Sequence, residues 1–227
     1  TWERRTGPGK PGNTRGNWYG FASSSDGVKL ITGDANNGYI YLSTNSGNTW
    51  TQRSVPNITT GYWRGFASSS DGTILFTGNA NNGYLYISIN SGLNWTERTG
   101  AGQGNWFGFA CSSVGTSLIT GKENGPIYTS TNSGENWSVR GGAGTGKWYG
   151  FATNTTITKI VTGNADNGSI IRSVNSGSSW QGSTGAGVGQ WYGFANSSDG
   201  VKIVTGNANN GYIYTSGDSA ATWVASV

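Results

Sequence analysis

The apolar positions of this chain fall in short runs separated by polar, glycine-rich segments, and the first such group sets the pattern. Residues 18–23 (WYGFAS) are predicted to form an aromatic strand, and residues 28–32 (VKLIT) a second strand that ends in β-branched side chains. Residues 39–43 (YIYLS) alternate with the period of a third strand, and residues 49–53 complete the group. No window of the chain has the period of an amphipathic helix. The pattern therefore predicts an all-β protein.

Polar turns separate these strands. Residues 25–27 (SDG) are predicted to turn the chain between the first and second strands. Residues 36–38 (NNG) are predicted to form a type I′ hairpin turn, because an Asn-Gly pair tolerates the positive φ that both central positions need. The pair recurs in each group, as Asn37-Gly38, Asn82-Gly83, Asn124-Gly125, Asn167-Gly168 and Asn210-Gly211.

Two phrases repeat along the chain and account for its tryptophans. The phrase W-x-G-F-A begins at Trp18, Trp63, Trp106, Trp148 and Trp191, at spacings of 45, 43, 42 and 43 residues. A second phrase, which reads STNSGNTW in the first group, occupies residues 43–50, 88–95, 130–137, 173–180 and 216–223. Ten of the eleven Trp lie in these phrases, and the last, Trp2, lies in a leftover piece at the N-terminus.

Four short strands in a repeat of about 43 residues are typical of a β-propeller blade. We expect a five-bladed β-propeller of four-stranded antiparallel blades in a single domain, 1–227. The repeat units are predicted at 18–53, 63–98, 106–140, 148–183 and 191–227. Residues 1–7 match the start of a fourth strand and are predicted to be an extra outer strand. This strand either closes the ring or adds to a sheet edge of another chain, which would give self-association.

The second phrase resembles the Asp box of the BNR repeat families, which include sialidases, some other glycoside hydrolases and photosystem II assembly factors. The Asp of the box is replaced by Asn at Asn45, Asn90, Asn132 and Asn175, and is present only at Asp218. At the same box, Ala220 replaces the usual Gly. The resemblance implies that the Ser or Thr, the amide or carboxylate and the Trp tie together the hairpin between the third and fourth strands. It implies a fold more than a function.

Composition excludes several kinds of chemistry. The 227 residues contain no His, which removes Ser-His-Asp and Cys-His nucleophile pairs and His-ligated zinc. The single Cys, Cys111, excludes an internal disulfide and a Cys-x-x-Cys metal site, and we expect it to be a small buried thiol. The net charge is +4, but the Lys and Arg residues are dispersed, so we expect no nucleic-acid partner. We also expect no cofactor, no metal and no membrane insertion.

The location is predicted to be extracellular or at the cell surface. Six N-x-S/T sequons, which leave glycosylation open, begin at Asn57, Asn94, Asn136, Asn154, Asn167 and Asn196.

Candidate ligand-binding residues gather where the first strands begin and where the Asn-rich turns lie, which a propeller places on one face. Aromatic rings stack on the C–H faces of sugars, and amides bond sugar hydroxyls. The predicted carbohydrate site comprises Trp18, Tyr19, Asn36, Trp63, Arg64, Asn81, Trp106, Trp148, Trp191, Tyr192 and Asn209. The alternative interpretation is that each Trp packs between blades and each Asn caps its own turn.

Three functions follow in order of preference. The first is a lectin-like propeller that binds glycans or glycoproteins through repeated shallow sites. The second is a structural or assembly protein that uses its surplus strand and its faces to contact other chains. The third is a sialidase-type hydrolase. We expect that the protein is not an enzyme. Most Arg residues repeat from blade to blade, whereas catalysis needs one asymmetric cluster, and no pairing is visible among the singular carboxylates Asp34, Glu123, Glu135 and Asp166.

Overall fold

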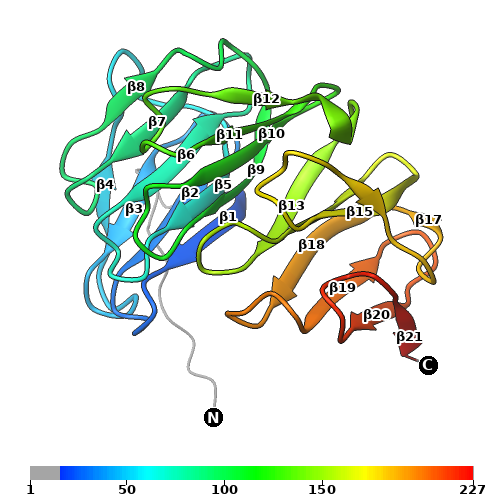
Figure 1. Ribbon diagram of the computed structural model, residues 1–227. Coiled ribbons are helices and arrows are strands. Elements are labelled where there is room, and N and C mark those ends of the chain that lie inside the picture. The colour runs from blue at the N-terminus through cyan, green and yellow to red at the C-terminus, as the bar shows by residue number, and fades with distance from the viewer. Residues whose placement is uncertain (1–15, 227) are drawn as a thin grey trace. The chain divides into compact units, whose positions relative to one another are not determined.

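The computed structural model describes residues 16–226, and its strands form five antiparallel sheets, one for each sequence repeat (Figure 1). The first sheet contains β1 (Trp18–Ser23), β2 (Leu30–Asp34), β3 (Ile40–Ser43) and β4 (Thr51–Arg53). The second contains β5 (Trp63–Ser68), β6 (Leu75–Asn79), β7 (Leu85–Ser88) and β8 (Thr96–Arg98). The third contains β9 (Trp106–Cys111), β10 (Leu118–Lys122), β11 (Ile127–Ser130) and β12 (Ser138–Arg140), which a 3-10 turn follows at Gly141–Ala143.

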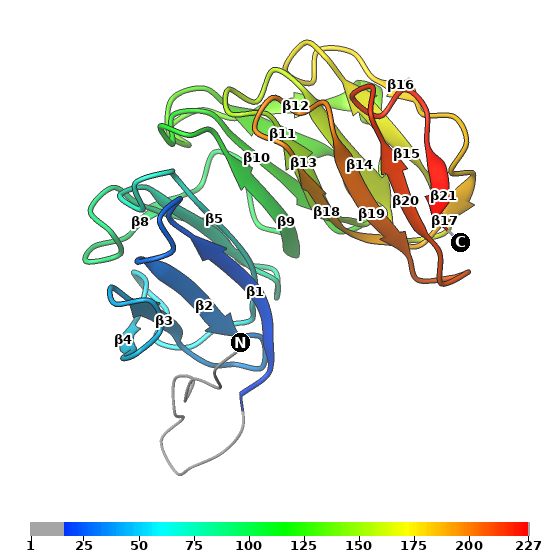
Figure 2. The same ribbon diagram turned by 90° about the horizontal axis from the view of Figure 1, so that it is seen from below.

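The last two sheets have the same order. The fourth contains β13 (Trp148–Thr153), β14 (Ile160–Asn164), β15 (Gly168–Ser173) and β16 (Gln181–Gly182), and the short β17 (Val188–Gly189) also pairs with β15. The fifth contains β18 (Trp191–Asn196), β19 (Ile203–Asn207), β20 (Ile213–Ser216) and β21 (Val224–Ser226), which follow one another across the sheet in Figure 2. The predicted fold class, a five-bladed β-propeller of four-stranded blades, is confirmed.

The chain divides into two compact units. Among the described residues, one unit holds 16–106 and 113–115, and the other holds 107–112 and 116–226. The prediction of a single domain over 1–227 stays a prediction. The surplus strand predicted over residues 1–7 lies outside the described residues.

The second strand of the first blade starts two residues later than predicted, because a side chain holds the preceding turn. The Asp26 carboxylate accepts hydrogen bonds from the Ser24 hydroxyl (2.5 Å) and from the Val28 N–H (3.0 Å). The Ser24 N–H donates to the Lys29 carbonyl at 2.9 Å. Residues 28 and 29 therefore belong to the turn, and the strand begins at Leu30.

The prediction of type I′ turns at the Asn-Gly pairs is wrong. A type I′ turn needs positive φ at both residues of the pair. In the first four blades only the Asn has positive φ, as at Asn37 (φ 49°), and in the fifth blade only Gly211 has positive φ (77°). The turn is wider than a two-residue hairpin, with the Asp34 N–H donating to the Tyr39 carbonyl at 3.1 Å. Its organising side chain lies at the end of the second strand, where Asp34 Oδ1 accepts the Asn36 N–H at 2.9 Å.

Consecutive blades join through a Trp packed on a Gly. Gly163 in β14 lies so close to Trp191 that a Cβ atom on this glycine would be 2.5 Å from the Trp191 Cβ. The Trp191 Nε1–H donates to the Gly168 carbonyl at 2.9 Å, and Gly168 pairs with Gly189 just before the Trp. Within the first unit, Trp63 meets Gly33 and donates to the Gly38 carbonyl at 2.8 Å in the same way. Only glycine fits the second strand at this position.

The Asp-box phrase forms the hydrogen-bonded turn that the resemblance implies. The Ser43 hydroxyl donates to Asn45 Oδ1 (3.0 Å) and accepts the Gly47 N–H (2.9 Å), while Asn45 Oδ1 accepts the Thr49 N–H (2.9 Å). Ser46 and Gly47 both have positive φ, 55° and 80°. In the fifth blade the same conformation falls on Ser219 and Ala220 (58° and 63°), so the box keeps its shape without its usual Gly.

Replacing a junction glycine should destabilise the protein because a Trp covers it. We expect Gly163→Ala to lower the free energy of unfolding by about 1–3 kcal/mol, because the added methyl overlaps the Trp191 side chain. The control is Gly182→Ala on β16, which has no atom within 4 Å of the added carbon and should change the free energy of unfolding by less than about 0.5 kcal/mol. Urea unfolding of both variants measures the difference, and equal losses would contradict the packing role.

The fifth box should respond to acid where the other four do not. Hydrogen bonds from the Thr222 hydroxyl (2.6 Å) and N–H (2.9 Å), and one from Ser216, lower the pKa of Asp218 from 3.8 to about 2. A carboxyl group whose pKa is lower in the folded state than in the unfolded state stabilises the folded state at every pH above the unfolded pKa. This stabilisation is lost as the pH falls from about 4 to about 2.

Asp218→Asn copies the residue of the other four boxes and removes this titration. We expect wild type and variant to unfold at similar urea concentrations at pH 6, and the wild type to lose more of its midpoint between pH 4 and pH 2. Identical acid responses would show that Asp218 does not contribute.

Candidate ligand-binding site

Most of the tryptophans predicted to face a ligand are buried, so the prediction is wrong for Trp63, Trp106, Trp148 and Trp191. Their side chains are 1%, 0%, 3% and 0% exposed. Each belongs to a blade junction, where its Nε1–H donates to a glycine carbonyl of the preceding repeat. The alternative interpretation, packing between blades, accounts for these four. The fifth, Trp18, is half-buried and its ring meets the Tyr41 ring edge-on at 5.5 Å.

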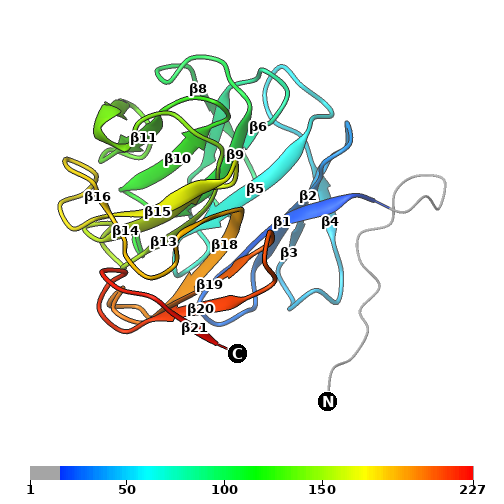
Figure 3. The same ribbon diagram turned by 90° about the vertical axis from the view of Figure 1, so that its right-hand side faces the viewer.

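The residue after each of these Trp points away from the junction and is partly exposed. This position holds Tyr19, Arg64, Phe107, Tyr149 and Tyr192. Tyr19 is 72% exposed and Tyr192 49% exposed. First strands of neighbouring blades lie side by side, β1 with β5 and β13 with β18 (Figure 3), so these side chains form rows. Three of the five, Tyr19, Arg64 and Tyr192, were predicted from the sequence.

The row in the second unit is aromatic. The Phe107 and Tyr149 rings meet edge-on with centroids 4.7 Å apart, and the Tyr149 and Tyr192 rings are stacked at 5.5 Å with 9° between their planes. Tyr192 therefore stacks on Tyr149 and is still 49% exposed. The row in the first unit is shorter and mixed, with the Arg64 guanidinium 5.7 Å from the centroid of the Tyr19 ring.

The predicted turn amides lie on the surface, and the alternative interpretation, that each caps its own turn, is wrong. Asn36, Asn81 and Asn209 are exposed, and the caps come instead from the residue two positions earlier. Asn207 Oδ1, for example, accepts the N–H groups of Gln190 (3.2 Å) and Asn209 (2.9 Å). The Asn209 amide remains on the surface, where it donates to Asn167 Oδ1 at 2.9 Å.

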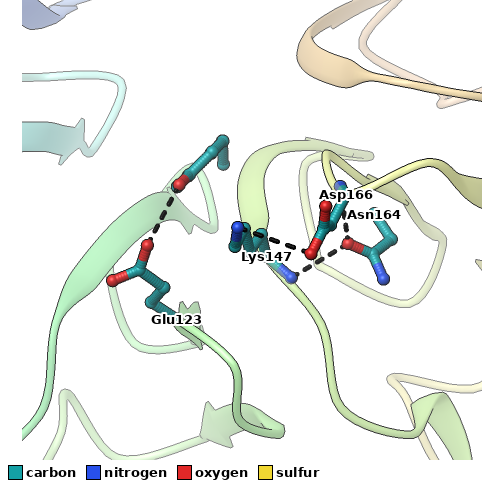
Figure 4. Close-up of polar contacts among 5 residues, drawn as sticks. Glu123, Lys147, Asn164 and Asp166 are labelled. Atoms are coloured by element: carbon teal, nitrogen blue, oxygen red, sulfur yellow. Dashed lines mark hydrogen bonds and ion pairs between the residues drawn. The ribbon is translucent and has the colours of Figure 1, made fainter.

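A polar pocket lies beside the aromatic row of the second unit. It has a volume of about 170 Å³ and is lined by Asn124, Thr145, Gly146, Lys147, Asn164 and Asp166. The Lys147 ammonium pairs with the Asp166 carboxylate at 3.4 Å, and Asn164 Oδ1 accepts the N–H groups of both residues at 3.0 Å (Figure 4). Lys147 and Asp166 therefore present one cation and one anion at the rim of the pocket.

The row and the pocket are linked through Glu123. Its carboxylate accepts a hydrogen bond from the Tyr149 hydroxyl at 3.3 Å. Figure 4 shows Glu123 on one side of Lys147, with Asn164 and Asp166 on the other. We call the set formed by Phe107, Tyr149, Tyr192, Glu123, Lys147 and Asp166 the aromatic–polar site.

Sequence reasoning placed only Tyr192 in this site. The sequence did contain a signal for Lys147. The position before each first-strand Trp holds Asn, Tyr, Asn, Lys and Gln, so Lys147 is the one charged residue at this repeat position. Two of the singular carboxylates, Asp34 and Asp166, occupy different positions of the repeat. Asp34 is fully buried as a turn cap, whereas Asp166 is exposed.

The site offers hydrogen bonding and one ion pair rather than metal ligation. Among residues 16–226, no group of three or more His, Cys, Asp or Glu side chains is arranged to hold a metal ion. In the same part of the chain, no helix has the length and apolar character needed to cross a bilayer. Cys111 is half-buried on β9, and burial raises the pKa of its thiol to about 12.

Comparison with known proteins supports the fold. No protein-family model matches the sequence, and no curated protein matches it. Among solved structures, a GH74 enzyme from Niastella koreensis is similar over 92% of this chain (TM-score 0.75, 17% identity). The chain spans 38% of that enzyme's length.

Two further structures are similar at the same level. A chain of the nidogen–laminin complex matches over 92% of this chain and 79% of its own length, with TM-score 0.72 and 13% identity. YCF48 bound to a D1 peptide matches over all of this chain and 71% of its own length, with TM-score 0.67 and 16% identity. These likenesses show a β-propeller repeat fold; membership of the Asp-box families stays a prediction.

The thiol should be nearly inert in the folded protein. We expect Cys111 to react with Ellman's reagent at pH 8 more than about tenfold slower than free cysteine, because burial keeps it protonated. Unfolding the protein in guanidinium chloride should restore the reaction rate of free cysteine. The Cys111→Ser variant, which has no thiol, serves as the blank. A fast reaction in buffer would show that the thiol is accessible and ionised.

Proposed function

We propose that this protein is a non-catalytic, glycan-binding β-propeller that acts outside the cell or at its surface, and that the aromatic–polar site is its principal ligand site. The observation that carries the proposal is the half-exposed Tyr192 ring, stacked in an aromatic row that lies beside a polar pocket. The ligand would be a glycan or a glycoprotein.

The aromatic half of the site supports this proposal through its rigidity. Tyr192 is held by stacking on Tyr149, and Tyr149 is held in turn by Phe107 and by its hydrogen bond to Glu123. A fixed ring loses little conformational entropy when an apolar sugar face stacks on it. The exposed Tyr19 in the first unit has Arg64 above its ring and no such stack, so we place the principal site on the second unit.

The polar half supplies the hydrogen bonds that a sugar needs. Lys147 can donate, Asp166 and Glu123 can accept, and the amides of Asn124 and Asn164 can do both. Lys147 and Asp166 already neutralise each other, so a neutral saccharide can bind between them without burying an unpaired charge.

The five repeats do not carry five equal sites. The position after the first-strand Trp is Tyr, Arg, Phe, Tyr and Tyr in the five blades, so its chemistry is not the same around the propeller. The proposal is therefore one principal site with Tyr192, in place of a ring of equivalent shallow sites.

The similar structures bear on the ligand class in two ways. One similar structure is named as a GH74 xyloglucanase, whereas YCF48 is seen with a D1 peptide and the nidogen–laminin structure is a complex. We favour a glycan for this chain because the aromatic–polar site combines the half-exposed Tyr192 ring with a Lys147–Asp166 ion pair whose charges neutralise each other.

Titration of neutral oligosaccharides tests the proposal, with saturation-transfer NMR to find the bound sugar. We expect Tyr192→Ala to weaken binding about fivefold or more, since an aromatic contact contributes about 1 kcal/mol beyond the buried area. The matched control is Tyr212→Ala, because Tyr212 is also 49% exposed but lies outside the row. It should bind like the wild type.

Two results would contradict the proposal. Binding to no oligosaccharide, with binding to peptides that Tyr192→Ala abolishes, would assign the same site to a protein ligand. Turnover of a chromogenic glycoside that Glu123→Gln abolishes would contradict its non-catalytic part.

A further inference from the structure

The connection between the first two blades is longer than those that follow it. It runs over residues 54–62, from β4 to β5, whereas the next two connections take only residues 99–105 and 141–147. The first connection is therefore two residues longer than either, and it carries the sequence Val55-Pro56-Asn57-Ile58. This extra length explains why the first spacing between the repeated Trp residues is 45 and not 42 or 43.

These four residues form a tight turn that is anchored at both ends. Val55 and Ile58 pair as an antiparallel bridge, which places Pro56 and Asn57 at the two corners. Pro at the first corner and a positive φ at the second are features of a type II turn, and Asn57 has φ 65°. Val55 is 5% exposed, and Ile58 packs against the same apolar cluster, so the turn is fixed to the core of the first unit.

The tip of this turn is accessible. Pro56, Asn57 and Thr59 are exposed. Among residues 16–226, the Asn57 side chain makes no hydrogen bond, so both hydrogens of its Nδ2 are available. Residues 57–59 read Asn-Ile-Thr, which is one of the six N-x-S/T sequons of the chain. The turn therefore presents an unengaged acceptor amide two residues before a hydroxyl that is also exposed.

Two of the other sequons have an amide that is fully engaged in the fold. Asn154 Nδ2 donates to two threonine hydroxyls, at 3.2 and 2.8 Å. Asn196 Nδ2 donates to two backbone carbonyls, at 2.8 and 2.7 Å. Attachment of a sugar replaces one of the two amide hydrogens, so each of these residues would lose a hydrogen bond on modification.

The remaining three sequons run into strands. Those that begin at Asn94 and Asn136 have a box Trp in the middle and end on the first residues of β8 and β12. The one that begins at Asn167 continues into β15. An acceptor sequon is typical of a surface loop. Among the six sequons, all of which lie within residues 16–226, only that of Asn57 combines a place outside the strands with an unengaged amide.

We propose that Asn57 is the N-glycosylation site of this chain. The proposal rests on the extracellular location in the proposed function, because N-glycans are added in the secretory pathway. In the transfer, Asn57 Nδ2 forms a bond to the anomeric carbon of a lipid-linked oligosaccharide, the bond from this carbon to the lipid diphosphate breaks, and one amide proton is released. The glycan leaves from the exposed corner of the turn, so the Val55 and Ile58 contacts remain intact.

Secretion of the full chain from a eukaryotic host, followed by measurement of its intact mass, tests the proposal. We expect the mass of one N-glycan, which peptide-N-glycosidase should remove while converting the attachment residue to aspartate. Asn57→Gln and Thr59→Ala should both lose the glycan mass, because the first removes the acceptor amide and the second removes the sequon hydroxyl. Thr60→Ala is the matched control, since it removes the neighbouring hydroxyl outside the sequon, and it should keep the glycan.

Three results would overturn the proposal. The first is a secreted, folded wild type whose Asn57 carries no glycan. The second is an Asn57→Gln variant that keeps the full glycan mass. The third is a glycan on Asn154 or Asn196 of the folded protein, which would show that engaged amide hydrogens do not prevent modification. Circular dichroism with thermal unfolding confirms that each secreted variant is folded.

Oligosaccharide binding by the same preparation is a separate readout. A secreted protein that binds oligosaccharides but has an unmodified Asn57 contradicts the glycosylation site and leaves the proposed function standing. A protein that carries the glycan on Asn57 but binds no oligosaccharide contradicts the proposed function and supports the glycosylation site.

Discussion

The fold depends on one contact, a tryptophan packed on a glycine of the preceding blade. The glycine is required because a Cβ atom there would overlap the Trp, and the indole N–H is satisfied by a carbonyl of the same blade's turn. The contact buries the largest side chain of the repeat and leaves no polar group of that side chain unpaired. The protein folds with few Leu, Ile and Val residues because a buried Trp supplies the apolar core at these junctions.

The sequence predicts the blades well because their signals are local and repeated. A period near 43 residues and the box phrase were sufficient to place all five sheets and the box hydrogen bonds. The turn at Asn37 was mispredicted because the Asp34 side chain, which caps a wider turn, overrides the preference of the Asn-Gly pair. The assignment of Trp148 and Trp191 to a ligand failed because periodicity shows which residues repeat and not which side of a strand they occupy.

The site is formed by positions at which the repeats differ. Tyr149 and Tyr192 occupy one repeat position, yet their stacking depends on β13 and β18 lying side by side, which no single repeat encodes. Glu123, Lys147 and Asp166 come from two blades and meet only after the blades pack. Repeated residues thus stabilise the propeller, whereas irregular ones give the second unit a surface of its own.

The division between buried, repeated Trp and exposed, variable residues can be tested directly by NMR with a bound oligosaccharide. Indole N–H signals are resolved from the rest of the spectrum and report each Trp separately. The account predicts ligand-induced shifts at Tyr192, Tyr149 and Lys147, with the Nε1–H signals of Trp63 and Trp106 unchanged. Shifts concentrated at those buried indoles, with none at Tyr192, would contradict it.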